Sequence, residues 1–494
     1  MGNSFTKNIS WPWNNAEKIL VFLFFATFPF NLRKVFLTPY SFPKGEFNEY
    51  MTLSLNWSDI LILSLIIIYI IKRLISQLYK PNRESFYGNN NNTILSSITH
   101  RNTFLLHCIT RLFKVTIFSA RSETFLLFLF FLWLVISIIW APFRLIAIYR
   151  LFIIFFIFTF AVIIRNLAKK GDIKAEFIYL GLFTSGIFQS LIGISQFILN
   201  RSLGLKILGE SILGPGLPGV AKIIVSGVKH IRAYGTFPHP NILAGFLVIP
   251  IVLLVSLLAK RFTQKDPAGE KVSHETILAK IPAWFLFCAL FINMSCFILT
   301  FTRSAFLSLF LAGIALLLIN LAYAGKKTWL ILAILFFTFL IFGFINISRH
   351  SKNFLFSSQS LEERNQYLNV SREIIIQHPL SGVGLGQFVF QEIVSNSDWP
   401  GWQYQPTHNI YFLIASELGI VGLALFLLLL LTILIKYCIV NDLFVLLTKK
   451  PFCFIILSFL FISFFDHYFW DVKLGIITFI LPFLLMNISV ESSD

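Results

Sequence analysis

The chain alternates between long apolar runs and short polar connections. Twelve apolar runs can be read along it, most of them close to the roughly 20 residues that a membrane-spanning helix needs. They cover residues 19–38, 53–71, 124–140, 145–164, 177–199, 240–258, 281–301, 304–323, 329–347, 409–435, 451–465 and 474–488. We therefore predict an all-α fold, a polytopic membrane helical bundle of about 12 transmembrane helices that forms a single domain over residues 1–494.

The basic residues are unevenly distributed between the connections. Most of the 40 lysine and arginine residues fall in the tails and in every second connection, which by the positive-inside rule places both termini in the cytoplasm. This distribution accounts for the net charge of +17, so the lipid bilayer is an expected partner and nucleic acid is not. Only 13% of the residues are charged, against about 25% in soluble domains, which excludes a water-soluble protein.

Three connections are longer than turns. Between the second and third runs, apolar residues on one face of 105–117 predict an in-plane cytoplasmic helix. On the outside, residues 200–239 and 348–408 form long loops. In the second, the Ser360–Glu363 capping box predicts a helix that ends at about Gln377, before His378-Pro379, and the glycines at 382, 384 and 386 predict a flexible turn. We expect residues 348–408 to be a structured extracytoplasmic loop that packs as a lid.

Two arginines lie where the positive-inside rule does not put them. Arg232 precedes the run at 240–258, in a segment that continues to Asn241, and Arg303 lies in an outer turn between two runs with almost no loop. A charge at such a position is costly unless it faces a polar cavity or an anion. Contact with lipid headgroups is one interpretation. The other is a substrate diphosphate, because a guanidinium can donate two parallel hydrogen bonds to phosphate oxygens.

Four further residues are candidates of lower rank or different role. Arg364 shares a face of the predicted loop helix with apolar residues, and an ion pair with Glu363 is the alternative to a functional role. His408 ends the loop at the mouth of the run at 409–435, where an imidazole of near-neutral pKa suits a general base, a phosphate ligand or a neighbour of the helix cap. Asp466 and His467 form one more outer polar cluster, and a helix cap within an aromatic belt is the alternative.

The sequence offers little for a metal or an organic cofactor. The five cysteines form no Cys-x-x-Cys pair and have no histidine at ligand spacing, and no acidic pair in the first outer loop is placed to hold Mg²⁺. We therefore predict no metal site and no cofactor.

In their order along the chain these motifs resemble the O-antigen ligase and polymerase-like family of polytopic membrane glycosyltransferases. The similar segments are Arg232 to Asn241, Thr300 to Ala305, Arg364 with His378-Pro379-Leu380-x-Gly382-Val383-Gly384, and His408-Asn409 before a run containing Gly419 and Gly422. The resemblance covers residues 225–435, which we take as the ligase-related core. The pair Phe301-Thr302 departs from the small residues common in the family.

The resemblance implies a GT-C-like fold and a metal-independent, inverting glycosyltransferase of the bacterial cytoplasmic membrane. The donor would be a glycan on undecaprenyl diphosphate, and the acceptor would be a glycan, a lipid or a protein-linked acceptor on the outer face. Arg232 and Arg303 would bind the diphosphate, His408 would be the catalytic base, and Arg364, Asn241, Asp466 and His467 are secondary candidates.

Three functions stay open from the sequence. A ligase and a repeat-unit polymerase use the same chemistry, and no motif separates them. A flippase that moves the lipid-linked glycan is the third, although the structured outer loop and the lack of a polar stripe through the spans disfavour it.

Overall fold

The computed structural model describes residues 2–78, 122–225, 227–263, 277–323, 341, 345, 358–396, 398–435 and 451–491. The in-plane helix predicted at 105–117 and almost all of the apolar run at 329–347 lie outside these residues.

The predicted predominance of helix is confirmed. The long helices are α1 (Gly2–Thr27), α2 (Trp57–Leu78), α4 (Ser122–Ser137), α5 (Arg144–Lys169), α6 (Ala175–Leu199), α7 (Pro240–Thr263), α9 (Ala283–Leu299), α10 (Arg303–Tyr323), α12 (Ser358–Gln377), α14 (Ile410–Leu434), α16 (Phe452–Ile462) and α18 (Lys473–Glu491). Three short helices are α8 (Ile277–Lys280), α13 (Phe388–Ser395) and α17 (Tyr468–Asp471). Within the described ranges, four helices are long and apolar enough to cross a membrane: α5, α6, the Pro240–Leu258 part of α7, and α14. The total of about 12 spans stays a prediction.

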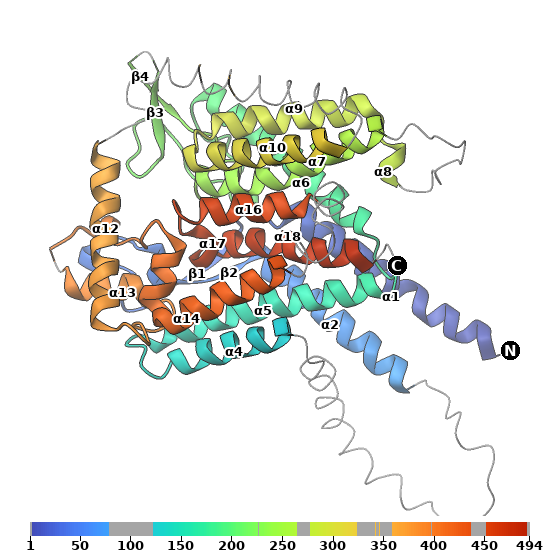
Figure 1. Ribbon diagram of the computed structural model, residues 1–494, viewed down its shortest axis with the longest axis horizontal. Coiled ribbons are helices and arrows are strands. Elements are labelled where there is room, and N and C mark those ends of the chain that lie inside the picture. The colour runs from blue at the N-terminus through green and yellow to red at the C-terminus, as the bar shows by residue number, and fades with distance from the viewer. Residues whose placement is uncertain are drawn as a thin grey trace, which may run out of the picture.

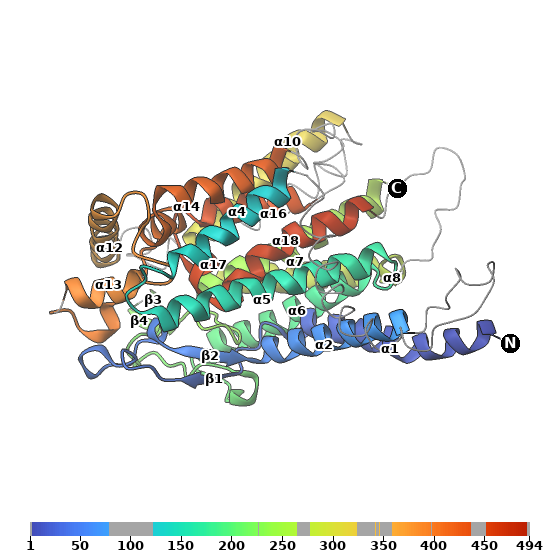
Figure 2. The same ribbon diagram turned by 90° about the horizontal axis from the view of Figure 1, so that it is seen from below.

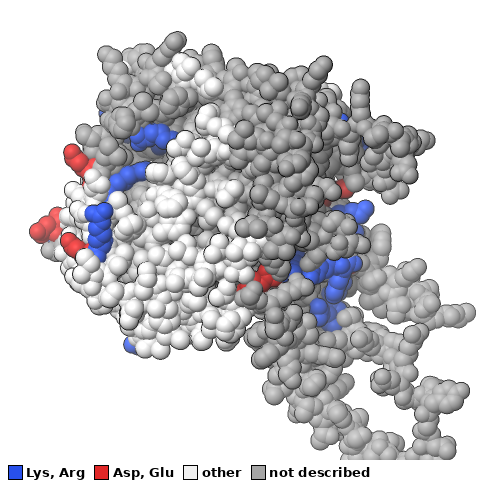
Figure 3. Space-filling model, in the orientation of Figure 1, with Lys and Arg blue, Asp and Glu red and all other residues white. Residues whose placement is uncertain are grey.

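Apart from α12, which crosses the direction of the others in Figure 1, the long helices run side by side, with the irregular parts of the chain gathered at one end. Figures 1 and 2 show the strands together with α12 and α13 at the left end, and both chain termini at the right end. Figure 3 shows a broad uncharged face between two regions where lysine, arginine and acidic side chains gather. This is the arrangement expected for a bundle whose apolar middle faces lipid and whose charged ends face water.

Helix α7 is the centre of the bundle. In its apolar stretch 78% of the residues are buried, whereas the corresponding shares in α5, α6 and α14 are only 33%, 56% and 39%. It packs against α6, α9, α16 and α18. The N-terminus of α7 therefore carries Asn241 to the middle of the strand-rich end.

The first two apolar runs are not single helices, which corrects their predicted bounds. Helix α1 ends at Thr27, because Pro29 follows and has no N–H to continue the helical hydrogen bonds. Residues Arg33–Phe36 form β1, which pairs antiparallel with β2 (Leu53–Asn56), with Arg33 opposite Asn56. A second hairpin joins β3 (Lys222–Val225) and β4 (Val228–Ile231) between α6 and α7.

The helix predicted in the 348–408 loop is confirmed, with its end at Gln377 as expected and its start at Ser358. The turn that follows is not a free flexible turn. It fills a break in α14 at Gly419, whose φ of 67° and ψ of −176° are not helical. Val383 N–H donates to Ser416 O (2.9 Å), Gly384 N–H to Glu417 O (2.8 Å), and Ile420 N–H to Pro379 O (2.8 Å). These bonds satisfy backbone groups that the break would otherwise orphan.

The glycines of this junction are required by close contact. A Cβ on Gly419 would lie 2.1 Å from Leu380 O, and one on Gly382 would lie 2.4 Å from the carbonyl carbon of Glu417. The turn at residues 379–384 of the outer loop is therefore bound to α14. This contact fixes the position of His408, which lies just before the first residue of α14.

Candidate active site

Arg232 is placed by the hairpin that precedes α7. Its backbone N–H donates to Ala221 O at 3.1 Å, and the next residue, Ala233, donates to Leu299 O at 2.9 Å. The first bond closes the β3–β4 hairpin and the second ties it to the end of α9. The two predicted arginine segments, distant in sequence, are thereby brought together.

The guanidinium of Arg232 is held by neutral acceptors. Nε donates to Thr300 O (2.6 Å), and Nη2 donates to Asn241 Oδ1 (2.8 Å) and Thr302 Oγ1 (3.0 Å). Burial lowers its pKa to about 10, so it stays protonated at neutral pH. Among the described residues, the two N–H groups of Nη1 have no partner, and they are the part of the fork that can bind an anion.

The turn between α9 and α10 explains the Phe301-Thr302 pair. Phe301 is buried in the left-handed region at φ 53° and stacks on Phe197 with ring centroids 5.9 Å apart. This backbone conformation favours small residues, and here the aromatic packing compensates a strain of roughly 1 to 3 kcal/mol. The turn points Thr302 at Arg232 and starts α10 at Arg303, which is exposed.

Asn241 links the arginine to an aspartate from the far end of the sequence. While its Oδ1 accepts from Arg232, its Nδ2 donates to Asp466 Oδ2 at 2.6 Å. The other oxygen of Asp466 accepts from the backbone N–H of His467 at 3.0 Å. The Asp466 carboxylate is buried and fixed from both sides, so it cannot turn away from the site.

Two histidines lie on the other side of this aspartate. The rings of His408 and His467 are 5.0 Å apart and nearly perpendicular, and His408 also stacks on Tyr367 at 5.7 Å. His467 Nδ1 bonds Asp471 Oδ2 at 2.8 Å. His408 Nδ1 is buried and has no hydrogen-bond partner among the described residues.

The surroundings give the two imidazoles opposite charge states. Burial lowers the pKa of His408 to about 3, and the nearby charges of His467 and Arg364 add to this, against the opposing effect of Asp466. Burial also acts to lower the pKa of His467, but Asp471 outweighs it and the net shift is upward. The near-neutral pKa expected for His408 is therefore wrong: it is a neutral imidazole, and the titrating one is His467.

The charge of Asp466 is set by its neighbours. Burial alone would raise its pKa, yet nearby positive charges, first that of His467 and also that of Arg364, bring it below the usual value. Arg303 and Arg364 both lower the pKa of Arg232 by their positive charge. Three guanidinium groups thus lie within electrostatic reach of one another around an ionised carboxylate.

The structure brings all the residues predicted as site candidates to one end of the bundle. These are Arg232, Asn241, Arg303, Arg364, His408, Asp466 and His467. Four partners were missed: His239, whose Nδ1 accepts from Asn241 N–H (3.2 Å), Thr302, Tyr367 and Asp471. His239 and Asp471 stand inside the polar segments already selected, and their spacing from Asn241 and His467 is the signal that could have found them.

Within the described ranges, no group of three or more His, Cys, Asp or Glu side chains is arranged to hold a metal ion. The carboxylates of Asp466 and Asp471 already bind Asn241 and His467. The donors at this site suit an anion rather than a cation.

The fold and the site define a helical membrane protein with a cationic, histidine-containing polar site at one end of its bundle. Residues 286–427 match the family model described as O-antigen ligase, and the predicted resemblance is confirmed over this segment. The match runs from α9 into α14 and contains Arg303, Arg364 and His408. No curated protein matches the chain.

Proposed function

We propose that the protein is a glycosyltransferase of the O-antigen ligase type that uses a glycan on undecaprenyl diphosphate as donor. It acts on the outer face of the bacterial cytoplasmic membrane, with both termini in the cytoplasm. The observation that carries the proposal is the convergence of Arg232, Arg303 and Arg364 from three separate segments onto one end of the bundle.

The charges at the site suit a diphosphate. Arg232, Arg303, Arg364 and His467 carry positive charge at one end of the bundle. A diphosphate diester carries about two negative charges, which such donors bind. Positive charge held in place before the reaction stabilises the leaving group as charge develops on it, which is the role that a metal ion has in other transferases.

The transfer is a displacement at the anomeric carbon with inversion. An acceptor hydroxyl oxygen forms a bond to that carbon, the bond to the diphosphate oxygen breaks, and the electron pair leaves on undecaprenyl diphosphate. The hydroxyl proton passes to a base. Arg232 Nη1 and the exposed Arg303 bind the leaving diphosphate.

His408 is the proposed base, because it is neutral and its Nδ1 has no partner among the described residues. An imidazole of pKa about 3 is a weak base, but a diphosphate bound beside Arg232 would add negative charge nearby, which raises that pKa. Asp466, ionised and fixed by Asn241, helps by stabilising the protonated imidazole. The competing role for His408 is a hydrogen bond to phosphate with no proton transfer.

A repeat-unit polymerase of the same chemistry is the alternative within this class, since the donor site would be the same. Nothing in the described bundle favours a flippase, which requires no residue at the position of His408.

The experiment is glycan transfer in reconstituted vesicles that contain an undecaprenyl-diphosphate-linked donor. Arg303→Ala should abolish transfer while the protein remains inserted. Arg201→Ala, at an exposed arginine after α6 on the same side, is the matched control and should be fully active. Retention of more than half of wild-type transfer by Arg303→Ala would contradict the diphosphate role.

A further inference from the structure

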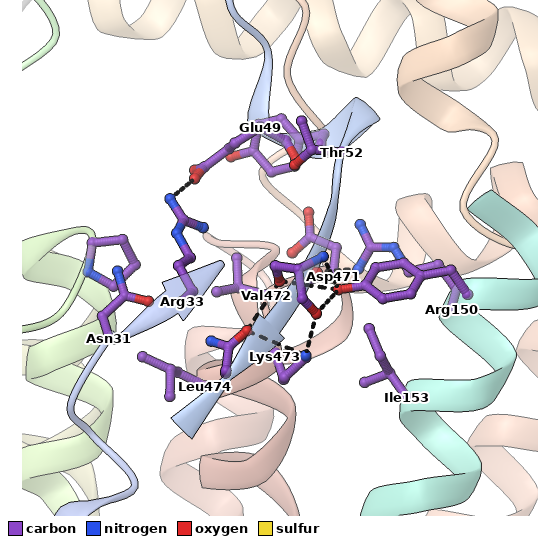
Figure 4. Close-up of a pocket in the computed structure, with 15 residues that line it drawn as sticks. Asn31, Arg33, Glu49, Thr52, Arg150, Ile153, Asp471, Val472, Lys473 and Leu474 are labelled. Carbon is purple, nitrogen blue, oxygen red and sulfur yellow. Dashed lines mark hydrogen bonds and ion pairs between the residues drawn. The ribbon is translucent and has the colours of Figure 1, made fainter. Parts of the chain in front are cut away.

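A polar cavity of about 70 Å³ lies next to the candidate site, and none of the roles above uses it. Figure 4 shows it between the β1–β2 hairpin, the start of α5 and the junction of α17 and α18. Three of its lining residues touch the candidate site. Tyr50 has its ring 5.8 Å from that of His467, Asp471 bonds His467, and Pro238 precedes His239.

The contacts form an ordered path from the arginines to this cavity. Arg232 contacts Asn241, Asn241 contacts Asp466, and Asp466 is followed by His467, which contacts Tyr50 and Asp471. The cavity is therefore at the opposite end of this series of contacts from the guanidinium group of Arg232. An inverting displacement requires the attacking hydroxyl to approach from the side away from the leaving diphosphate, and the cavity lies beyond His467, whose ring is 5.0 Å from that of the proposed base His408.

Two of the three cations that line the cavity are paired with carboxylates. Arg33 pairs with Glu49 at 2.9 Å, and Lys473 pairs with Asp59 at 2.6 Å while also donating to Ser54 O and Asn56 Oδ1. Arg150 donates to the backbone carbonyl of Asp471. Among the described residues Arg150 has no carboxylate partner, but a second phosphate would also meet the carboxylates of Glu49 and Asp471, which disfavours an anion in this cavity.

The other groups that can bind a ligand in the cavity are neutral. Among the described residues, the hydroxyl of Tyr50, the side-chain amide of Asn31 and Nδ2 of Asn56 have no hydrogen-bond partner, and all three residues line the cavity. Tyr50 and Tyr149 add aromatic rings with an apolar face and a polar tip. Such a volume holds roughly five water molecules, about the number that the hydroxyl groups of one sugar ring replace.

We propose that this cavity is the acceptor site and that it binds a neutral sugar ring, with Tyr50 and Asn31 as recognition residues. The proposal rests on the proposed glycosyl transfer, and it identifies the acceptor as an uncharged saccharide. It also gives the first outer loop, residues 28–56, the task of selecting the acceptor.

The test measures sugar and diphosphate binding separately on the purified full-length protein in detergent. Saturation-transfer NMR with methyl glycosides of glucose, galactose, mannose and N-acetylglucosamine measures sugar binding to the cavity. Binding of farnesyl diphosphate measures the affinity of the arginine cluster for a diphosphate. Tyr50→Phe and Asn31→Ala remove one polar group each, and each should weaken glycoside binding by roughly threefold to tenfold with farnesyl diphosphate binding unchanged. Tyr40→Phe is the matched control, because Tyr40 lies on the same loop but packs on Phe143 and Phe390, and it should bind both probes as wild type does.

Three results would overturn the proposal: no glycoside binding to the wild type, unchanged glycoside affinity in both Tyr50→Phe and Asn31→Ala, or tighter binding of glucose 6-phosphate than of methyl glucoside at this site. A failure of the proposed function would give a different result. In that case Arg232→Gln would bind farnesyl diphosphate as tightly as wild type, regardless of its affinity for the glycosides. Unfolding temperatures of the variants separate a lost contact from a damaged fold.

Discussion

Replacement of Arg232 by lysine tests the geometry of the donor site, because lysine keeps the charge but not the fork. The native guanidinium satisfies Thr300 O, Asn241 Oδ1 and Thr302 Oγ1 and still has both N–H groups of Nη1 for an anion. An ammonium has three N–H groups for the same four tasks. Either a buried acceptor or the phosphate must lose its donor.

The size of the effect follows from these contacts. A buried acceptor left without its donor costs about 1 to 3 kcal/mol, and a diphosphate that loses a desolvated cation costs about 3 to 5 kcal/mol. We therefore expect Arg232→Lys to weaken transfer by roughly tenfold to a hundredfold and Arg232→Ala by roughly 10² to 10³-fold or more. In both variants the protein should remain inserted in the membrane.

The assay is initial-rate transfer in vesicles over a range of donor concentrations, with Arg201→Ala as the control. Loss of donor affinity in Arg232→Ala, greater than in Arg232→Lys, is the expected order. If Arg232→Lys transferred as fast as wild type, the argument from the three neutral acceptors would be wrong.

Four further outcomes are expected. His408→Ala should lower turnover by roughly 10² to 10⁴-fold with donor binding nearly unchanged, and His408→Gln should be equally inactive; near-wild-type transfer by the glutamine variant would make this residue a phosphate ligand. The pKa of His467 is raised above 6.5, so its positive charge is complete below that pH and is lost as pH rises through the raised pKa. Donor binding should therefore weaken at alkaline pH, and Asp471→Asn should shift this loss of binding to lower pH. If the pH profile of donor binding were the same in Asp471→Asn, His467 would have no role in binding the donor. Gly419→Ala should destabilise the protein by roughly 2 to 5 kcal/mol in thermal unfolding, whereas Gly171→Ala, at positive φ with open space around it, should cost less; equal losses would refute the packing argument. In an otherwise cysteine-free protein in intact cells, a cysteine at Lys44 should react with a membrane-impermeant reagent and one at Gly171 should not, and the reverse would invert the topology.

Much of the fold was predictable from periodicity. The end of α12 at Gln377 followed from the proline two residues later, and the apolar runs located α5, α6 and α14 to within a few residues. The strand β1 was not predictable in this way, because a four-residue strand adjoining an apolar helix carries too few positions to show a period of two. Pro29 was the one signal that the helix ends before it.

The site residues were predictable as types and as positions along the chain, but not in their charge states. Arg232 and Arg303 stood out because a cation at the outer end of a span needs a reason. The pKa values of His408 and His467 depend on burial and on Asp471, Asp466 and Arg364, which come from two segments about 100 residues apart in the sequence. The cavity behind His467 depends on the first outer loop meeting the last helix, a contact that no local pattern encodes.

The most direct test of the central claim is the preference of the purified protein for a diphosphate over a monophosphate on the same short polyprenol. If the cationic cluster binds the diphosphate of the donor, the wild type should bind farnesyl diphosphate at least about tenfold more tightly than farnesyl monophosphate, and Arg303→Ala should lose most of that preference. Equal affinity for the two lipids in the wild type, or an unchanged preference in Arg303→Ala, would contradict the account.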